Sequence, residues 1–289
     1  LWVTKIAINF PLGKHFSWPI TCEWKTEGKL GFRYHTSKEK LKEVILGQIF
    51  TLTSFAQESD HEVGVWQFRT VDESDVENFL YNEDNVYRKL AAEAIKGGKL
   101  VHWALLRKVN GYLHDDSPNY FFYNGFKDLE NLDDPTIWGS GSVDGLKPVE
   151  SVNLYGAVHS TSEVQVFPDV PKPGNYVVIN YANPSNVLEF VNLQNEVWKP
   201  FITKYINDDN STSSGWEVHR VLSPTGNGYN WTVATVDHYT TLSGALNPFP
   251  EGAEWPEGLD QINDLMPNGK FYKTVIYEVL YYEGPNASK

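Results

Sequence analysis

Two stretches of this chain repeat one pattern of apolar residues, and this repetition restricts the fold more than any other feature. DNVYRKLAAEAI runs from Asp84 to Ile95, and NEVWKPFITKYI runs from Asn195 to Ile206, an offset of 111 residues (195 − 84). Apolar residues in and before both stretches recur at three- and four-residue steps, which is the pattern of a helix that lies on a core. Turn-forming sequence that can cap a helix, such as Asn186, precedes each one. The chain is therefore predicted to use one helical unit twice.

Strand candidates surround both helices. VGVWQFRTV precedes the first helix and NYVVINYA the second, and both are rich in β-branched and aromatic residues. After each helix, two more candidates are linked by a turn rich in Gly, Asn and Pro, which indicates a hairpin. SEVQVFPD and KTVIYEVLYYEG complete the two copies. The predicted fold class is α+β, with two tandem ferredoxin-like β-α-β-β-β units, at residues 58–170 and 171–289, that pair their antiparallel sheets.

The segment EVWKPFITKYI…GWEVHRVLSPTGNGYNWTVATVDHY carries a family resemblance, with a weaker echo in the first copy. It resembles the dimeric α+β barrel superfamily of bacterial proteins, which includes antibiotic-biosynthesis monooxygenase-like proteins. In that superfamily two ferredoxin-like units pair their sheets, between subunits or within one fused chain. The resemblance implies a pseudo-dimeric α+β barrel here. It covers about 220 residues without a diagnostic catalytic motif, so it is a likeness of fold that does not carry function.

Residues 1–57 are predicted to form an N-terminal extension that contains a signal-like segment at 38–56. This segment runs from lysines through an apolar stretch to the small residue Ala56, the order of a secretory signal. A buried strand or helix is the alternative, because Glu43 dilutes the apolar stretch and because other residues precede the segment. On the signal interpretation, the mature protein is extracytoplasmic, either periplasmic or secreted.

Composition and missing motifs exclude several classes of protein. The net charge of −13, without a basic cluster, argues against nucleic acid as a partner. The single cysteine, Cys22, excludes an intrachain disulfide framework and a cysteine-based zinc site. No apolar run is long enough for a transmembrane helix. The sequence also lacks a phosphate loop, a dinucleotide fingerprint and an H-E-x-x-H helix, so neither a cofactor nor a metal is predicted.

Pro200 distinguishes the second helix from the first. Proline has no N–H and its ring clashes with the carbonyl of Glu196, so a kink is expected there. Lys89 holds the matching position in the first helix (200 − 111), which is expected to be straight. A kink moves half of the helix away from the sheet, so the second unit is predicted to hold the roomier helix–sheet pocket. The alternative is that Pro200 only fits the helix to a bulky core.

Strand alternation selects the candidate site residues. Along the predicted strand 216–222, Glu217 and His219 share one face and Arg220 lies on the other. Along the next strand, His238 and Asp237 also lie on opposite faces, and the register decides which of these residues approach each other. The candidate catalytic residues are His219, Asp237 and His238, and the candidate substrate-binding residues are Trp198, Arg220, Trp216 and Tyr239.

Three functions fit this pattern. The first is a binding protein that holds a small apolar molecule or a protein partner in or around the second helix–sheet pocket, as a monomer with a pseudo-dimeric core or as a homodimer. The second is a cofactor-free monooxygenase-like or isomerase-like enzyme that uses a histidine as proton carrier. The third is a haem-binding protein with His219 or His238 as axial ligand. The structural alternatives are an exposed strand histidine, an ion pair of Arg220 and core packing of the aromatic residues.

Overall fold

The computed structural model describes residues 6–8, 20–24, 30–32, 62–109, 118–134, 136–138, 143–226 and 229–285. The chain divides into two compact units, residues 1–59 and 60–289. In the first unit, β1 (Ile6–Ile8), β2 (Ile20–Trp24) and β3 (Leu30–Phe32) form an antiparallel sheet. The signal-like segment lies outside the described residues, so secretion stays a prediction. Among the residues described, no helix has the length and apolar character needed to span a membrane.

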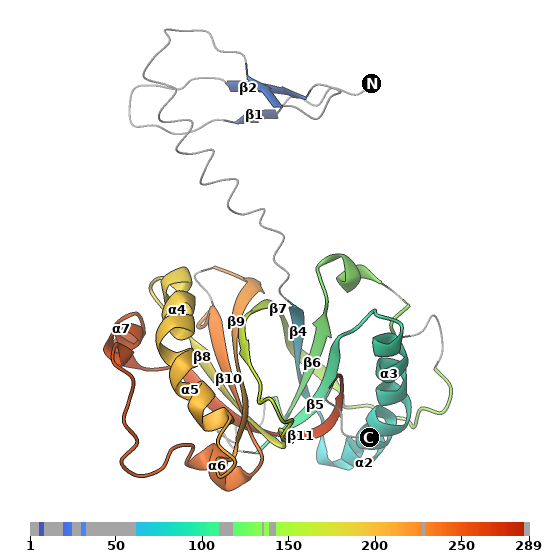
Figure 1. Ribbon diagram of the computed structural model, residues 1–289. Coiled ribbons are helices and arrows are strands. Elements are labelled where there is room, and N and C mark those ends of the chain that lie inside the picture. Colours follow the sequence, from blue (N-terminus) through green and yellow to red (C-terminus); the bar gives the residue numbers. More distant parts are fainter. Residues whose placement is uncertain are drawn as a thin grey trace. The chain divides into compact units, whose positions relative to one another are not determined.

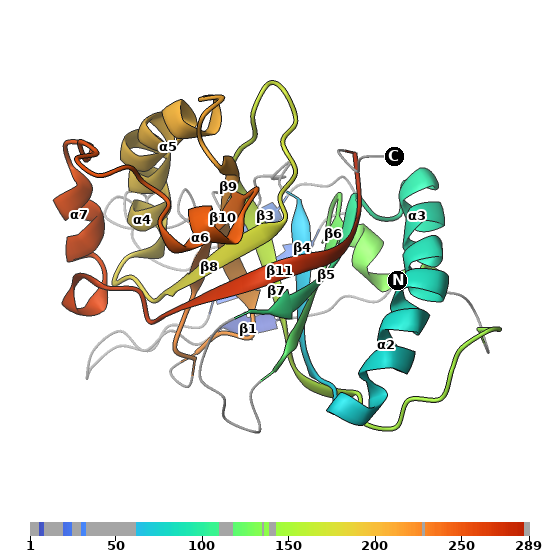
Figure 2. The same ribbon diagram turned by 90° about the horizontal axis from the view of Figure 1, so that it is seen from below.

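Eight strands of the second unit form one closed antiparallel barrel. Figures 1 and 2 show this sheet with helices on either side of it. In order around the barrel, the strands are β10 (Val233–Tyr239), β8 (Tyr176–Ala182), β11 (Lys273–Glu283), β5 (His102–Lys108), β6 (Tyr120–Phe126), β4 (Val63–Thr70), β7 (Asn153–Val166) and β9 (Ser213–Ser223). Strand β9 pairs with β10 and closes the ring, which leaves no edge strand exposed.

The predicted fold class, two tandem ferredoxin-like units that pair their sheets, is wrong. Strands form at the predicted places, but hydrogen bonds between strands join the two halves of the chain into a single sheet. Strand β5 pairs with β11 in a register that sets Arg107 opposite Glu278, and β7 pairs with β9 in a register that sets Val166 opposite Trp216. Local apolar patterns specify which face of a strand is buried, whereas these pairings join residues far apart in sequence.

Each half contributes one long interrupted helix. In the first, α2 (Val76–Asn82) and α3 (Arg88–Lys96) flank the π-helical segment η2 (Glu83–Tyr87). In the second, α4 (Val187–Leu193) and α5 (Lys199–Ile206) flank the π-helical segment η4 (Gln194–Trp198). Shorter elements are η1 (Glu73–Asp75), η3 (Glu130–Asp133), α6 (Leu242–Leu246), α7 (Leu259–Asp264) and η5 (Pro267–Gly269).

The expectation that Pro200 breaks only the second helix is wrong. Both helices carry a π-helical segment, and the two segments start 111 residues apart (194 − 83). In the first helix Lys89, which has an ordinary N–H, stands where the second has proline. The interruption therefore does not need the proline, and Pro200 lies at the start of α5 after the π segment has already changed the helical register.

The helices cover the outer face of the barrel with apolar side chains. Phe190, Ile202 and Ile206 of the second helix are at most 1% exposed and pack in one cluster with Trp216 and Val218 of β9. Burial of each such side chain stabilises the fold by about 1.5–3 kcal/mol. This cluster fills the space between helix and sheet among the described residues, whereas the cavity described below lies inside the barrel.

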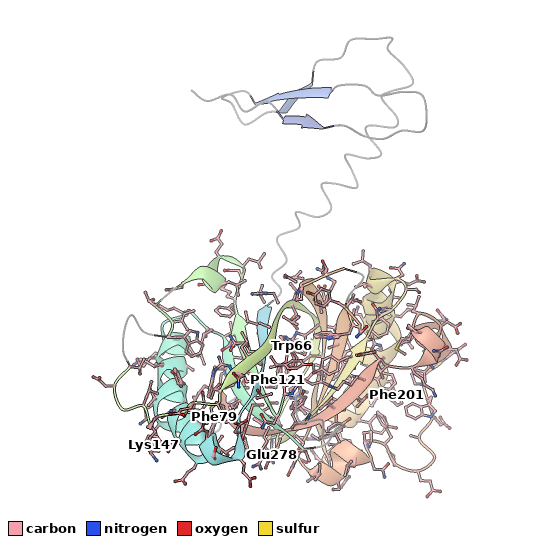
Figure 3. The ribbon with its side chains drawn as sticks, turned by 180° about the vertical axis from the view of Figure 1, so that it is seen from behind. Trp66, Phe79, Phe121, Lys147, Phe201 and Glu278 are labelled. Atoms are coloured by element: carbon pink, nitrogen blue, oxygen red, sulfur yellow. The ribbon has the colours of Figure 1, made fainter. Side chains whose placement is uncertain are left out.

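A separate apolar cluster fills part of the barrel interior. It includes Trp66, Phe121 and Ile179, which come from three different strands. Figure 3 shows Trp66 and Phe121 in the middle of the barrel, with Phe79 and Phe201 toward the helices on either side. Inward and outward side chains thus alternate along each strand, and the inward ones from both halves of the chain face a common interior.

Candidate functional site

The barrel interior holds a cavity of about 550 Å³. This volume lies within the range of roughly 300–1,000 Å³ that is typical of sites for small molecules. Much of the wall is apolar or aromatic, and it is contributed by both halves of the chain. The apolar lining includes Trp66, Ala104, Leu106, Phe121, Val177, Ile179 and Val236.

A carboxylate between two histidines forms part of the wall. Strand alternation turns Glu217 and His219 inward from β9 and His238 inward from β10. The Nε2 atom of His219 lies 3.1 Å from Oε2 of Glu217, and the Nε2 atom of His238 lies 2.8 Å from Oε1. The side chain of Glu217 is 12% exposed, that of His219 is 3% exposed and that of His238 is 20% exposed, so Glu217 and His219 are almost removed from water and His238 is partly buried.

The electrostatics of Glu217 fix the hydrogen-bond direction. Burial alone would raise the pKa of this carboxyl, but the hydrogen bonds and charges of His219 and His238 outweigh burial and hold the pKa well below its ordinary value. An ionised carboxylate only accepts hydrogen bonds, so each Nε2 atom carries the hydrogen. The Nδ1 atom of His219 is buried and has no hydrogen-bond partner among the described residues. In neutral His219 that atom therefore holds an unused lone pair.

A second acid–base group lines the same cavity. Nε2 of His102 on β5 lies 3.2 Å from Oε2 of Glu62, and its Nδ1 shares a hydrogen bond of 2.8 Å with the hydroxyl of Tyr282. Tyr123 donates a hydrogen bond of 2.5 Å to Oε1 of Glu62. Burial lowers the pKa of His102, but the hydrogen bond and charge of Glu62 and the charge of Glu217 more than offset this, so the pKa is raised.

The two groups adjoin and make the cavity amphipathic. The His219 ring packs edge-on against Tyr123, with ring centroids 5.8 Å apart, and against Trp66, with centroids 5.2 Å apart. We call the combined set the polar belt: Glu62, His102, Tyr123, Glu217, His219, His238 and Tyr282.

The arginine and lysine side chains in the cavity wall already form ion pairs or hydrogen bonds with other residues of the protein. Arg88 and Lys172 are the lysines and arginines among the described lining residues. Arg88 pairs with Glu283 at 2.6 Å and with Asp84 at 3.1 Å, and Lys172 donates hydrogen bonds to backbone carbonyls, including that of Ile206. The site therefore favours a neutral, mostly apolar molecule over a carboxylate or a phosphate.

Four of the seven residues predicted for the site lie on the outer face of the barrel. Arg220 donates a hydrogen bond of 2.7 Å to Glu163, which is the ion pair considered as its alternative role. Trp216 is fully buried beneath the second helix. Asp237 and Tyr239 point outward from β10, and neither lines the cavity.

Trp198 also lies away from the cavity, whereas the two predicted histidines line it. The Trp198 ring is stacked 6.3 Å from Trp255 and contacts Phe201 and Phe249, which places it in an aromatic cluster at helix α5. Of the predicted site residues, the structure thus brings only His219 and His238 together around one group.

The sequence analysis missed five members of the polar belt. Alternation already placed Glu217 on the face of His219, so a search for charged neighbours on that face finds it. The other four lack such a local signal, because they come from segments that only barrel closure brings together: Glu62, His102, Tyr123 and Tyr282.

A haem would have to be held through an Nδ1 atom. The Nε2 atoms of His102, His219 and His238 are each bonded to a glutamate, and Nδ1 of His102 is bonded to Tyr282, whereas Nδ1 of His219 has no partner among the described residues. The two long helices contain no histidine, and their inner faces are packed against the barrel. Within the described ranges, no group of three or more His, Cys, Asp and Glu side chains is arranged to hold a metal ion.

Comparison with known proteins gives a distant likeness. No protein family and no curated protein matches the sequence. Among solved structures, the chain is similar to an anthrone oxidase-like protein, with 11% identity and a TM-score of 0.46 over 78% of this chain and 94% of that one. It is also similar to a proposed monooxygenase from Fusobacterium nucleatum, with 11% identity and a TM-score of 0.47 over 79% and 96% of the two chains. A chlorite dismutase mutant from Candidatus Nitrospira defluvii matches at 10% identity and a TM-score of 0.44 over 79% and 94%. Similarity this low does not assign the chain to a family.

Proposed function

We propose that the barrel interior is a catalytic site at which His219 takes a proton from a small, mostly apolar substrate. The observation that carries this proposal is the buried Glu217 carboxylate, which is bonded to Nε2 of both His219 and His238. A protein that only held an apolar molecule would have no need of an ionised carboxylate in a dry interior, because burying a charge is costly. The arrangement supports an enzyme over a simple binding protein.

The chemical step is general base catalysis by one imidazole. Nδ1 of His219 accepts the proton of a weakly acidic C–H or O–H group on the substrate, and the carboxylate of Glu217 stabilises the imidazolium that forms. The raised pKa of His102 favours its charged form, which is paired with the Glu62 carboxylate in the same cavity. The bonds of Glu217 hold His219 in the tautomer that leaves Nδ1 free.

Two reactions can follow from the substrate anion. If His219 returns the proton to a different atom of the substrate, the reaction is an isomerisation. If the anion reacts with dissolved O₂, the enzyme is monooxygenase-like without a cofactor. Both begin with the same proton transfer, so a test of that transfer addresses the proposal before a substrate is identified.

A phenolic probe can report the proton transfer directly. We choose 2-naphthol, an apolar molecule whose absorption moves to longer wavelength when its hydroxyl ionises. Phenols of this type ionise near pH 10 in water, so an ionised probe at neutral pH requires a base in the protein. We expect the full-length protein to bind 2-naphthol at about pH 7 and to show the band of the anion, since a positioned base favours ionisation.

Matched variants test whether His219 of the polar belt ionises the bound 2-naphthol. His219→Gln should still bind the probe, but in its neutral form. His159→Gln changes a histidine of β7 that does not line the cavity, and it should behave like the unchanged protein. If the unchanged protein binds the probe without ionising it, the barrel is a binding site and the catalytic proposal is wrong. Equal ionisation in His219→Gln would assign the base to another residue.

A further inference from the structure

A second hollow lies beside the cavity and shares part of its wall. It has a volume of about 330 Å³ and is lined by Glu62, Val101, Lys127, Ser162, Glu163, Val164 and Gln165. Glu62 and Gln165 line both the hollow and the cavity. These two side chains therefore separate the buried polar belt from this hollow.

Glu62 is itself a member of the polar belt, and Gln165 is bonded to another member, Glu217. Oε1 and Oε2 of Glu62 face Tyr123 and His102 respectively, and the side chain is only 12% exposed. Gln165 donates a hydrogen bond of 3.3 Å to Oε2 of Glu217, the same oxygen that His219 contacts. Of the two, only Glu62 has a side chain that can gain and lose a proton.

The backbone around Glu62 holds its carboxylate at this boundary. The carbonyl of Glu62 accepts a hydrogen bond of 2.8 Å from the backbone N–H of Ser162, which ties the residue to β7. Gly125 of β6 leaves the room that the carboxylate occupies, because a side chain at that position would collide with Oε1 of Glu62. The position of the carboxylate is thus built into two neighbouring strands.

We propose that Glu62 is a proton relay that connects the buried polar belt with solvent through the second hollow. In the exchange step, His102 breaks its Nε2–H bond and Oε2 of Glu62 takes the proton, which leaves a neutral imidazole and a carboxylic acid. The acid then gives the proton to water or to a buffer base in the hollow and becomes a carboxylate again. Another proton can return by the same route. The relay extends the proposed function, because a cavity that takes protons from a substrate must also exchange them with water.

The relay can be tested without any ligand. The measurement is the exchange rate of the imidazole N–H of His102 with solvent, followed by nitrogen-15 NMR of the full-length protein with labelled histidine. Burial lowers the pKa of His102 once Glu62 no longer raises it, so each variant is measured at a pH where its ring nitrogen-15 shifts show the same, protonated charge state. Glu62→Gln should slow the exchange by about 100-fold, the lower end of the effect of a positioned proton carrier.

The sign of the change separates a relay from a purely structural partner. If Glu62 only held His102 in place, its replacement would loosen the hydrogen bond and speed the exchange. Gly125→Ala gives a second test that keeps every titratable group, because its methyl group displaces the Glu62 carboxylate, and it should also slow the exchange. Glu163→Gln, in the same hollow but away from the cavity, should leave the rate unchanged.

Unchanged or faster exchange in both Glu62→Gln and Gly125→Ala would overturn the relay. This result would leave the base role of His219 intact, since that role is tested by ionisation of 2-naphthol. Conversely, a failure of the 2-naphthol test would not alter the exchange rates, so the two proposals fail separately.

Discussion

Replacement of Asp237 by asparagine should make the protein more stable at alkaline pH. Asp237 is 9% exposed, and burial raises the pKa of its carboxyl from 3.8 to about 7, although the charge of His238 and a hydrogen bond from Asn180 oppose the rise. The folded protein therefore holds this proton to a higher pH than the unfolded chain does. Linkage then requires that stability fall as the pH rises from about 4 through 7.

The size of the effect follows from the two pKa values. The interval from 3.8 to about 7 corresponds to about 4 kcal/mol, at about 1.36 kcal/mol for each pH unit. An asparagine resembles the neutral acid, still offers an oxygen to Asn180 and does not titrate. At about pH 8 Asp237→Asn should therefore be more stable than the unchanged protein by about 4 kcal/mol, and at about pH 5 by less than about 2 kcal/mol.

Urea unfolding at the two pH values measures this difference. The 10 tryptophans give a fluorescence signal, and the midpoint and slope give the free energy of unfolding. Glu130→Gln, which removes an exposed carboxyl, serves as the control and should change the stability equally little at both pH values. A gap between Asp237→Asn and the unchanged protein that is the same at both pH values would refute the reasoning. So would an asparagine variant that is less stable at pH 8.

Two further substitutions probe the cavity wall. Glu217→Gln should destabilise the protein at neutral pH by about 3 kcal/mol, because it leaves the buried His219 and the partly buried His238 without their carboxylate. Since the native pKa of Glu217 is depressed, the unchanged protein should lose this advantage progressively as the pH falls below the ordinary value of 4.5, as urea unfolding at about pH 7 and at about pH 3 would show. Gly64→Ala should lower stability by about 1–3 kcal/mol in thermal unfolding, because its methyl carbon would lie 2.6 Å from the Tyr123 ring. An unchanged melting temperature for Gly64→Ala would show that Tyr123 can move aside freely.

The sequence predicted local structure well because local structure depends on nearby residues. The strand predicted from VGVWQFRTV is β4, and the helix predicted to follow Asn186 begins at Val187, with the Asn186 side chain accepting a hydrogen bond from the N–H of Glu189. Alternation also placed His219 and His238 on faces that prove to be inward. Each of these features depends on a period or a cap within a few residues.

The closed barrel and most of the candidate site could not be predicted from local sequence patterns. Pairing of β5 with β11 and of β7 with β9 depends on backbone hydrogen bonds between edges, which carry no side-chain pattern of their own. The π-helical segments also escaped prediction. The proline drew attention to the second helix, whereas the same interruption occurs in the first without one.

Closure of the barrel is also what gives the site its chemistry. Glu62 and His102 come from the first half of the chain, and Glu217 and His219 come from the second. Trp66 of the first half packs against the His219 ring of the second, so an apolar side chain of the first half shields the group around Glu217 from water. An open half would leave its carboxylate in water, where the attraction between a carboxylate and an imidazolium is weak. The strong coupling of Glu217 to its histidines therefore belongs to the assembled barrel, and this explains why neither half of the sequence, read alone, shows a catalytic motif.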